Sequence, residues 1–249
     1  MRHDFARTLN FAHRGARRAA PENTLAAFGL ALDRGADGIE LDTSLSQDGV
    51  LVVCHNLDVG ETSNGHGFIR DFSLAALREF DFGSWFDPAF AGERIPTLDE
   101  VFDLVGARGL VNIEMKTLSL RSNGLEAAVA GLIARRALYD QVIVSSFNPF
   151  ALRRLRRLDR RIELGLLYSA DLPLYLRRAW LRPWVKPQAL HPEYSMVDAG
   201  YMAWAQSHGY DVNVWTVNEE TEMQRLLDLG VTSIITDAPE RLRRVQAGR

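Results

Sequence analysis

Cysteine is almost absent from this 249-residue sequence, in which Cys54 is the single example. One cysteine cannot form an intrachain disulfide, so a small disulfide-stabilised scaffold is excluded and a reducing compartment is expected. The sequence also has no apolar run of about 18 residues, and its opening stretch, MRHDFARTLNFAHRG, lacks the apolar centre of a signal peptide. We therefore expect no transmembrane helix, no integral membrane association and a cytoplasmic location.

A large excess of one charge is missing as well. The 29 basic and 32 acidic residues leave a formal net charge of -3, so neither nucleic acid nor an anionic membrane is expected as the main partner. The basic stretch ALRRLRRLDRR is accordingly interpreted as the solvated face of an outer helix. We expect a small-molecule substrate and no nucleic-acid partner, while the oligomeric state stays open.

Short apolar, β-branched runs alternate with longer segments of helical period, such as 21–35, through most of the chain. Within the second apolar region, DGIELDTS and VLVVCH either continue one another or form a hairpin around QDG. Eight strand–helix units in about 250 residues predict an α/β fold, a TIM (β/α)8 barrel, over an open doubly wound sheet. The predicted strand regions are 9–13, 37–55, 109–117, 141–147, 162–169, 188–192, 211–218 and 232–239.

The second strand region carries carboxylates inside its apolar run. Glu40 and Asp42 are two residues apart, so their side chains point to the same face, which near the C-terminal end of a barrel strand is the barrel mouth. Glu114 and Lys116 repeat this spacing on a later strand. Converging carboxylates repel one another unless a cation lies among them, and oxygen ligands favour calcium, magnesium or manganese over zinc. We predict one divalent cation at Glu40, Asp42 and Glu114, with salt bridges to nearby Arg or Lys as the alternative.

Two histidines follow apolar runs, His13 after LNFA and His55 after VLVVC. A lone histidine is more often structural, but two at strand ends beside a cation site favour proton transfer, because imidazole titrates near neutral pH. Arg14 and Lys116 supply positive charge that suits a phosphate. Together these residues predict cleavage of a phosphate ester.

Several other side chains carry weaker signals. His191 ends a predicted strand and is a further candidate for lining the pocket, whereas Cys54 is expected to point into the packing around the barrel. The Trp-rich stretch LPLYLRRAWLRPWVKP has the composition of a membrane-interface segment, but a loop helix packed over the barrel rim is the favoured interpretation. The histidines predicted at the surface are His3, His66 and His208.

Five motifs occur in order over essentially the whole chain: AHRGARRAAPENTLAAF, GIELDTSLSQDGVLVVCHN, NIEMK, VWTVN and IITDAPE. Together they resemble the glycerophosphodiester phosphodiesterase family. The resemblance implies a TIM barrel that hydrolyses glycerophosphodiesters to glycerol 3-phosphate and an alcohol, using a divalent metal ion. It also implies a single barrel domain over residues 1–249, with a small insertion at about 56–110 that shapes the substrate end.

The family's functional residues carry over to this chain by their places in the motifs. The resemblance implies that the metal ligands are Glu40, Asp42 and Glu114, that the catalytic acid–base pair is His13 and His55, and that the substrate-binding residues are Arg14, Lys116 and Trp215. The aromatic role of Trp215 rests on the resemblance alone.

The chain departs from the family pattern just after the second histidine. Family members usually carry aspartate there, followed by an arginine before two hydroxyl residues, whereas this chain has Asn56 and Glu61. If the strand continues past His55, alternation turns the Asn56 side chain away from the metal. We expect Asn56 to accept backbone N–H groups of the following loop and the reaction class to be unchanged.

Two alternative functions remain open. One is lysophospholipase D-like hydrolysis of lysolipids at a membrane surface, for which the Trp-rich stretch is the only support. The other is a non-catalytic barrel that binds phosphodiesters without cleaving them. The presence of all three predicted metal ligands and both histidines argues against the second alternative.

Overall fold

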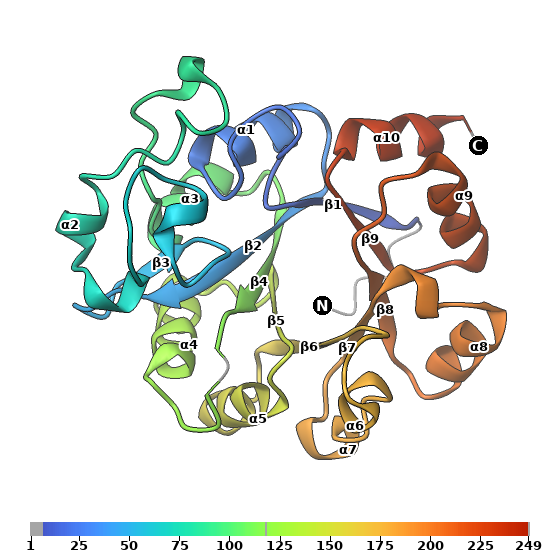
Figure 1. Cartoon of the computed structure of the whole chain (residues 1–249). Helices are drawn as coiled ribbons and strands as arrows, with labels where there is room; N and C mark the ends of the chain where they lie inside the picture. Colours follow the sequence, from blue (N-terminus) through green and yellow to red (C-terminus); the bar gives the residue numbers. More distant parts are fainter. Residues whose placement is uncertain (1–6, 118, 249) are drawn as a thin grey trace.

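The computed structural model describes residues 7–117 and 119–248 and folds around a closed parallel β-barrel (Figure 1). Strand β1 pairs with β2 on one side and with β9 on the other, which closes the barrel and excludes the open sheet. The predicted TIM (β/α)8 barrel is thus confirmed. Its strands are β1 (Leu9–His13), β2 (Gly38–Leu45), β4 (Leu110–Met115), β5 (Val142–Ser146), β6 (Glu163–Tyr168), β7 (Ala189–Pro192), β8 (Asp211–Val214) and β9 (Ser233–Thr236).

Helices surround the barrel, and several of them begin at a residue whose side chain caps the helix (Figure 1). Thr24 caps α1, so this helix starts after the PENT motif, inside the predicted range 21–35. Thr97 and Glu100 form a capping box at α3. None of the helices in the described ranges is long and apolar enough to cross a membrane. The helices are α1 (Leu25–Asp33), α2 (Leu74–Leu77), α3 (Leu98–Val105), α4 (Leu125–Arg136), α5 (Pro149–Leu158), α6 (Leu174–Arg177), α7 (Arg182–Val185), α8 (Ala199–Ser207), α9 (Glu220–Leu229) and α10 (Pro239–Ala247).

Residues 50–55 form a hairpin with the end of β2, which is one of the two arrangements predicted for this region. Strand β3 (Leu51–Val53) runs antiparallel to the end of β2, with Thr43 opposite Val53. His55 therefore follows a hairpin strand outside the barrel, and it does not end a barrel strand as His13 does. The hairpin carries His55 back along β2, the strand that bears two of the predicted metal ligands.

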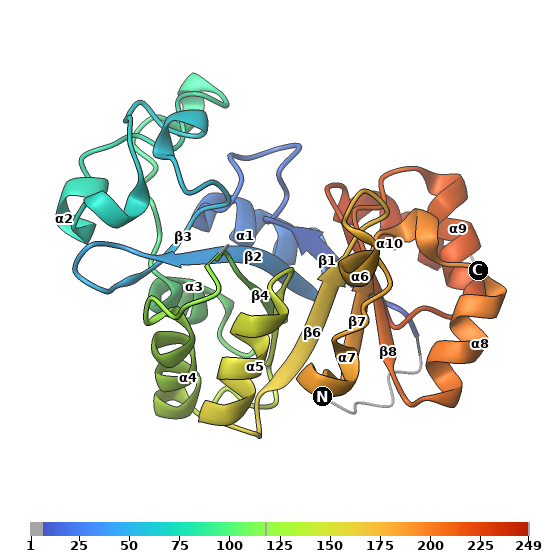
Figure 2. The same ribbon diagram turned by 60° about the horizontal axis from the view of Figure 1, so that its bottom comes forward.

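Between β3 and α3 the chain leaves the barrel and builds a small core of its own, and Figure 2 shows this segment projecting around α2. Cys54 is a buried core residue, as predicted, but it packs in this small core and not around the barrel itself. Turns and short 3-10 helices such as η2 (Ile69–Asp71) make up most of the segment. The small core consists of Val52, Cys54, Val59, Ile69, Leu77, Phe82 and Ile95.

The Trp-rich stretch between β6 and β7 forms two short helices, α6 and α7, in place of one helix over the rim. Ala179 and Val185 join the main core, and α7 packs against α5 in the outer ring (Figure 1). Trp180 and Trp184 remain exposed on this side of the molecule. The stretch therefore replaces one helix of the barrel's outer layer.

Candidate active site

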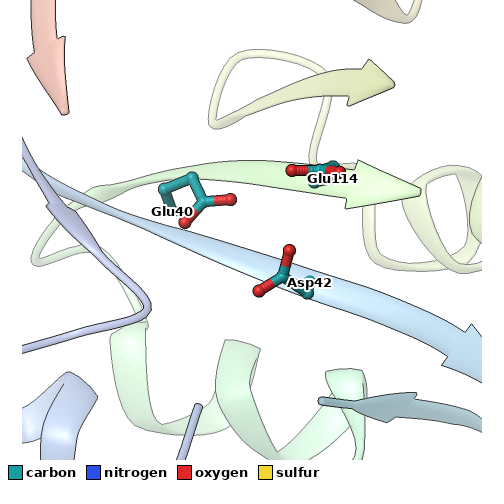
Figure 3. Close-up of side chains that lie close together, drawn as sticks. All are labelled: Glu40, Asp42 and Glu114. Carbon is teal, nitrogen blue, oxygen red and sulfur yellow. The ribbon is translucent and has the colours of Figure 1, made fainter. Parts of the chain in front are cut away.

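Three carboxylates converge inside the barrel, on two neighbouring strands. Glu40 and Asp42 come from β2, and the register of the sheet places Asp42 beside Glu114 of β4. Each of the three offers an oxygen within 4.8 Å of the others, and all three residues are buried (Figure 3). The two-residue spacing predicted that these three carboxylates converge, and in the structure they do.

Positive charge also lies among these carboxylates. Lys116 Nζ is 2.7 Å from a Glu114 oxygen and 3.1 Å from an Asp42 oxygen. Arg14 Nε lies 3.4 Å from an Asp42 oxygen. Asp42 also accepts a 2.9 Å hydrogen bond from Asn23 Nδ2. The salt-bridge alternative is thus present, and the remaining question is whether these cations balance the cluster.

The pKa values of the carboxyl groups indicate that Lys116 and Arg14 do not balance the negative charge of the cluster. Burial raises the pKa of Glu40 well above its usual value, and the charges of Asp42 and Glu114 raise it further. Burial likewise raises the pKa of Glu114 to about 7, against the opposing effect of Lys116. Burial also disfavours ionised Asp42, but Lys116 and Arg14 outweigh it and hold that pKa below its usual range. Two of the three carboxyl groups therefore lack a full counter-charge, which a divalent ion would supply.

A tight turn after β1 places His13 and Arg14 beside this cluster. Arg14 and Gly15 both have a positive φ, at 55° and 86°. A Cβ on Gly15 would lie 2.7 Å from the backbone of Ala27, so only glycine fits this turn. The turn directs the Arg14 backbone N–H to the Glu40 carboxylate at 3.2 Å. It thereby joins the end of β1 to a predicted metal ligand.

His13 is oriented by a carboxylate from the last strand. Its Nδ1 lies 2.6 Å from Asp237, and because a carboxylate only accepts, Nδ1 carries the hydrogen. Nε2 is then left facing Glu40, at 4.0 Å. Burial alone would raise the pKa of Asp237, but hydrogen bonds from His13 and Asn218 bring it down to about 2. Asp237 is therefore an ionised partner that fixes the ring of His13.

His55 is oriented by the two residues that depart from the family pattern. Asn56 Nδ2 donates to the Glu61 carboxylate, so Asn56 Oδ1 faces His55 and accepts from Nδ1 at 2.6 Å. The expectation that Asn56 accepts from the backbone of the loop is wrong, because the chain turns after β3 and its amide reaches the histidine ring. Burial lowers the pKa of His55 to about 4, although Asp42 opposes the shift.

Two of the three carboxylates, both histidines and both cations border one small cavity of about 120 Å³, here called the central pocket. Phe147 and Trp215 form an aromatic wall, with their rings edge to face and 5.4 Å apart. Asp42 lies behind the lining, in contact with Lys116 and Arg14. The lining residues are His13, Arg14, Glu40, His55, Asn112, Glu114, Lys116, Phe147, Leu167, Trp215, Thr216 and Ile235.

The other histidines lie elsewhere. His191 is fully buried between strands, where it accepts a 2.9 Å hydrogen bond from Asn213, and it is not among the residues that line the central pocket. Burial lowers its pKa to about 3. The prediction that it lines the pocket is therefore wrong. His66 and His208 are exposed, as predicted, and His3 lies outside the described residues.

Sequence reasoning missed several residues of the site. Asp237 directly follows β9, so the strand-end argument applied to Glu114 could have found it. Glu22 and Asn23 belong to the PENT motif, and they contact Arg14 at 2.8 Å and Asp42 at 2.9 Å. Asn112 lines the central pocket, and its buried Oδ1 has no hydrogen-bond partner in the described part of the chain. Asn112 is two residues before Glu114 in the motif NIEMK, so the same-face spacing could have found it.

This arrangement has the components for phosphoryl chemistry. The buried carboxylates could hold a hard cation, two imidazoles present Nε2 to the same cavity, and Arg14 and Lys116 could contact phosphate oxygens. Zinc is a poorer fit, because the cluster of carboxylates offers oxygen ligands alone.

Comparison with known proteins gives a consistent result. The model of the glycerophosphoryl diester phosphodiesterase family matches residues 13–241. A glycerophosphodiester phosphodiesterase of Caldanaerobacter subterraneus subsp. tengcongensis is 40% identical over 242 residues, covering 95% of this chain and 96% of the relative. A Bacillus subtilis protein of the same name is 32% identical, covering 97% and 87%.

Solved structures share the fold over the same length. An Oleispira antarctica phosphodiesterase, solved with the product sn-glycerol-3-phosphate, has a TM-score of 0.82 and 30% identity, covering 95% of this chain and 96% of that one. A glycerophosphodiester phosphodiesterase from Agrobacterium tumefaciens has a TM-score of 0.83 and 27% identity, covering 95% and 99%. The resemblance inferred from the five motifs is confirmed.

Proposed function

Since the chain belongs to the glycerophosphoryl diester phosphodiesterase family, and is thereby a phosphoric diester hydrolase, we propose that it hydrolyses glycerophosphodiesters to glycerol 3-phosphate and an alcohol with one divalent cation. The observation that carries this proposal is the cluster of three buried carboxylates beside one small pocket that both histidines line. The product complex of the Oleispira relative supports glycerol 3-phosphate as the retained product.

Glu40, Asp42 and Glu114 would hold the cation. Their oxygen donors and uncompensated negative charge suit calcium, magnesium or manganese. When bound, such an ion supplies positive charge that stabilises a phosphoryl oxygen as negative charge grows in the transition state. Lys116 keeps Asp42 and Glu114 in place from the other side.

The protein's own side chains would move the protons and position the diester. His13 and His55 both hold a hydrogen on Nδ1 for their orienting partners, so each transfers protons through Nε2. Arg14 and Lys116 neutralise phosphate charge. The aromatic wall formed by Phe147 and Trp215 would confine the substrate in the central pocket.

The proposed reaction is tested by comparing substrates with and without metal. Glycerophosphoglycerol and glycerophosphocholine should release glycerol 3-phosphate in the presence of calcium, magnesium or manganese, as followed by phosphorus NMR. Lysophosphatidylcholine should react much more slowly. Faster cleavage of the lysolipid would favour the lysophospholipase D alternative, and metal-dependent binding without any cleavage would favour the non-catalytic barrel.

Asn56 and Glu61 are proposed to orient His55 in place of the family's aspartate and arginine. Asn56→Asp would set two carboxylates against each other, because the residue that now donates to Glu61 would only accept. We expect the single variant to lower kcat/KM by several-fold, up to about tenfold, or about 1.4 kcal/mol in the barrier.

The double variant Asn56→Asp with Glu61→Arg restores an opposite-charge pair and should return kcat/KM to near the wild-type value. A double-mutant cycle measures this coupling, and Glu61→Arg alone completes the cycle. Purely additive effects of the two substitutions would contradict the proposed pairing.

A single domain over residues 1–249 and a location in the cytosol belong to the same proposal. Pairing of β1 with β9 supports the single domain, because the barrel closes only with both ends of the chain. The single cysteine supports a reducing compartment.

A further inference from the structure

A second, larger hollow adjoins the central pocket. This side groove of about 700 Å³ lies between the β2–β3 hairpin, the region around η2 and the loop that leads from β4 to α4. Its lining residues are Ser44, Leu45, Ser46, Gln47, Gly49, Leu57, Phe68, Ile69, Arg70, Lys116, Thr117, Ser119 and Asn123.

Among the described residues, Lys116 is the one that lines both hollows. Its ammonium group contacts two of the three clustered carboxylates, so it stands where the phosphate of a bound diester is expected. A phosphodiester has two alcohol arms that diverge from that phosphate. A small cavity and a larger groove that meet at Lys116 match this shape, with the glycerol arm in the central pocket and the leaving alcohol in the side groove.

The charge of the side groove is of one sign. Among the described residues that line it, none is Asp or Glu, whereas Arg70 and Lys116 are cationic. Arg70 lies over the ring of Phe68, at 5.1 Å, which holds the guanidinium at the edge of the groove. Its ion pair with Asp71, at 3.8 Å, involves side chains 78% and 59% exposed, and so exposed a pair neutralises little of the charge.

The rest of the lining is rich in hydrogen-bonding groups. Gln47 and Asn123 bring amides, and Ser44, Ser119 and Thr117 bring hydroxyls. The nearest acidic group of the hairpin, Asp48, is engaged elsewhere, with Ser46 Oγ at 2.6 Å and the Leu74 N–H at 3.0 Å. Amides and hydroxyls suit an alcohol that carries several hydroxyl groups.

We propose, on the basis of the function proposed above, that the side groove binds the leaving alcohol and selects uncharged polyols or anionic alcohols over cationic ones. A quaternary or primary ammonium group in the groove would meet the Arg70 guanidinium and no carboxylate among the described lining residues, since the carboxylates beside Lys116 are already paired with that lysine. A polyol such as inositol instead meets amides, hydroxyls and the face of Phe68.

The test compares glycerophosphoinositol with glycerophosphocholine as substrates of the wild-type protein and of Arg70→Glu. The wild type should have the higher kcat/KM with glycerophosphoinositol. Arg70→Glu should lower the ratio of the two kcat/KM values by about tenfold, a difference of about 1.4 kcal/mol, mainly through KM. Arg70 is exposed, so the substitution should leave folding intact.

Arg244→Glu, an equally charge-reversing change at an exposed position on α10, is the matched control and should leave the ratio unchanged. Two results would contradict the proposed selectivity of the side groove while leaving the proposed function intact. In the first, both diesters are cleaved and Arg70→Glu leaves the ratio of the kcat/KM values as in the wild type. In the second, the wild type prefers glycerophosphocholine. If the wild type cleaves neither diester in the presence of metal, the proposed function fails and the inference fails with it.

Discussion

His13→Ala is expected to lower kcat by about 10²–10⁴-fold, the usual contribution of a general acid or base. Its imidazole holds a hydrogen on Nδ1 for Asp237 and presents Nε2 to the central pocket, so alanine removes the proton-transfer group and leaves Asp237 without its partner. The measurement is steady-state hydrolysis of the best diester at saturating metal, with kcat and KM determined separately.

Three further variants make this result specific. His55→Ala should produce a loss of similar size, and His208→Ala, at the exposed C-cap of α8, should change kcat little. Asp237→Asn should lower kcat less than His13→Ala does, because the imidazole remains but loses its ionised partner. Near-normal turnover by either of the first two histidine variants would remove that residue from the proposed pair.

Local periodicity predicted those features that depend only on neighbours in the sequence. Strand–helix alternation gave the closed barrel, because parallel strands of this number and spacing bury their apolar faces by closing. The spacing of Glu40 and Asp42 placed both side chains on one face of β2. Because β2 and β4 are neighbours and their register pairs Asp42 with Glu114, the third carboxylate of the predicted cluster lies beside the other two.

Features that depend on contacts between distant segments could not be predicted in the same way. The strand-end argument could have placed Asp237 at the barrel mouth, but not its pairing with His13, which is 224 positions away in the sequence. Asn56 was assigned to the loop because strand alternation was extended three residues past the end of β3, which ends at Val53, where the backbone turns. His191 sits on a strand like the site residues, but its side chain packs against Asn213, which only the three-dimensional sheet reveals.

Removal of divalent metal is expected to lower the rate by at least about 10²-fold, the effect of losing one preorganised electrostatic contact at a reacting group. Without the ion, Lys116 and Arg14 are the cations in contact with the buried carboxylates in the described structure, and burial keeps the pKa of Glu40 and Glu114 raised. The site would then lack the charge that the phosphoryl oxygen requires. The measurement is hydrolysis by chelator-treated protein before and after calcium, magnesium or manganese is added.

Chelation should leave the fold intact, which separates a catalytic ion from a structural one. Lys116 already bridges Asp42 and Glu114, and two large clusters of buried apolar side chains, one over β1–β7 and one around β8 and β9, form the core of the barrel. The thermal unfolding midpoint should therefore change little on metal removal, beyond the small loss expected when a ligand of the native state is withdrawn. Glu114→Gln is the matched control: it keeps the side-chain size, removes one anionic ligand, and should raise the metal concentration needed for half-maximal rate. Full turnover by metal-stripped protein in excess chelator would instead mean that Lys116 and Arg14 suffice, and that the carboxylates serve as their counter-ions.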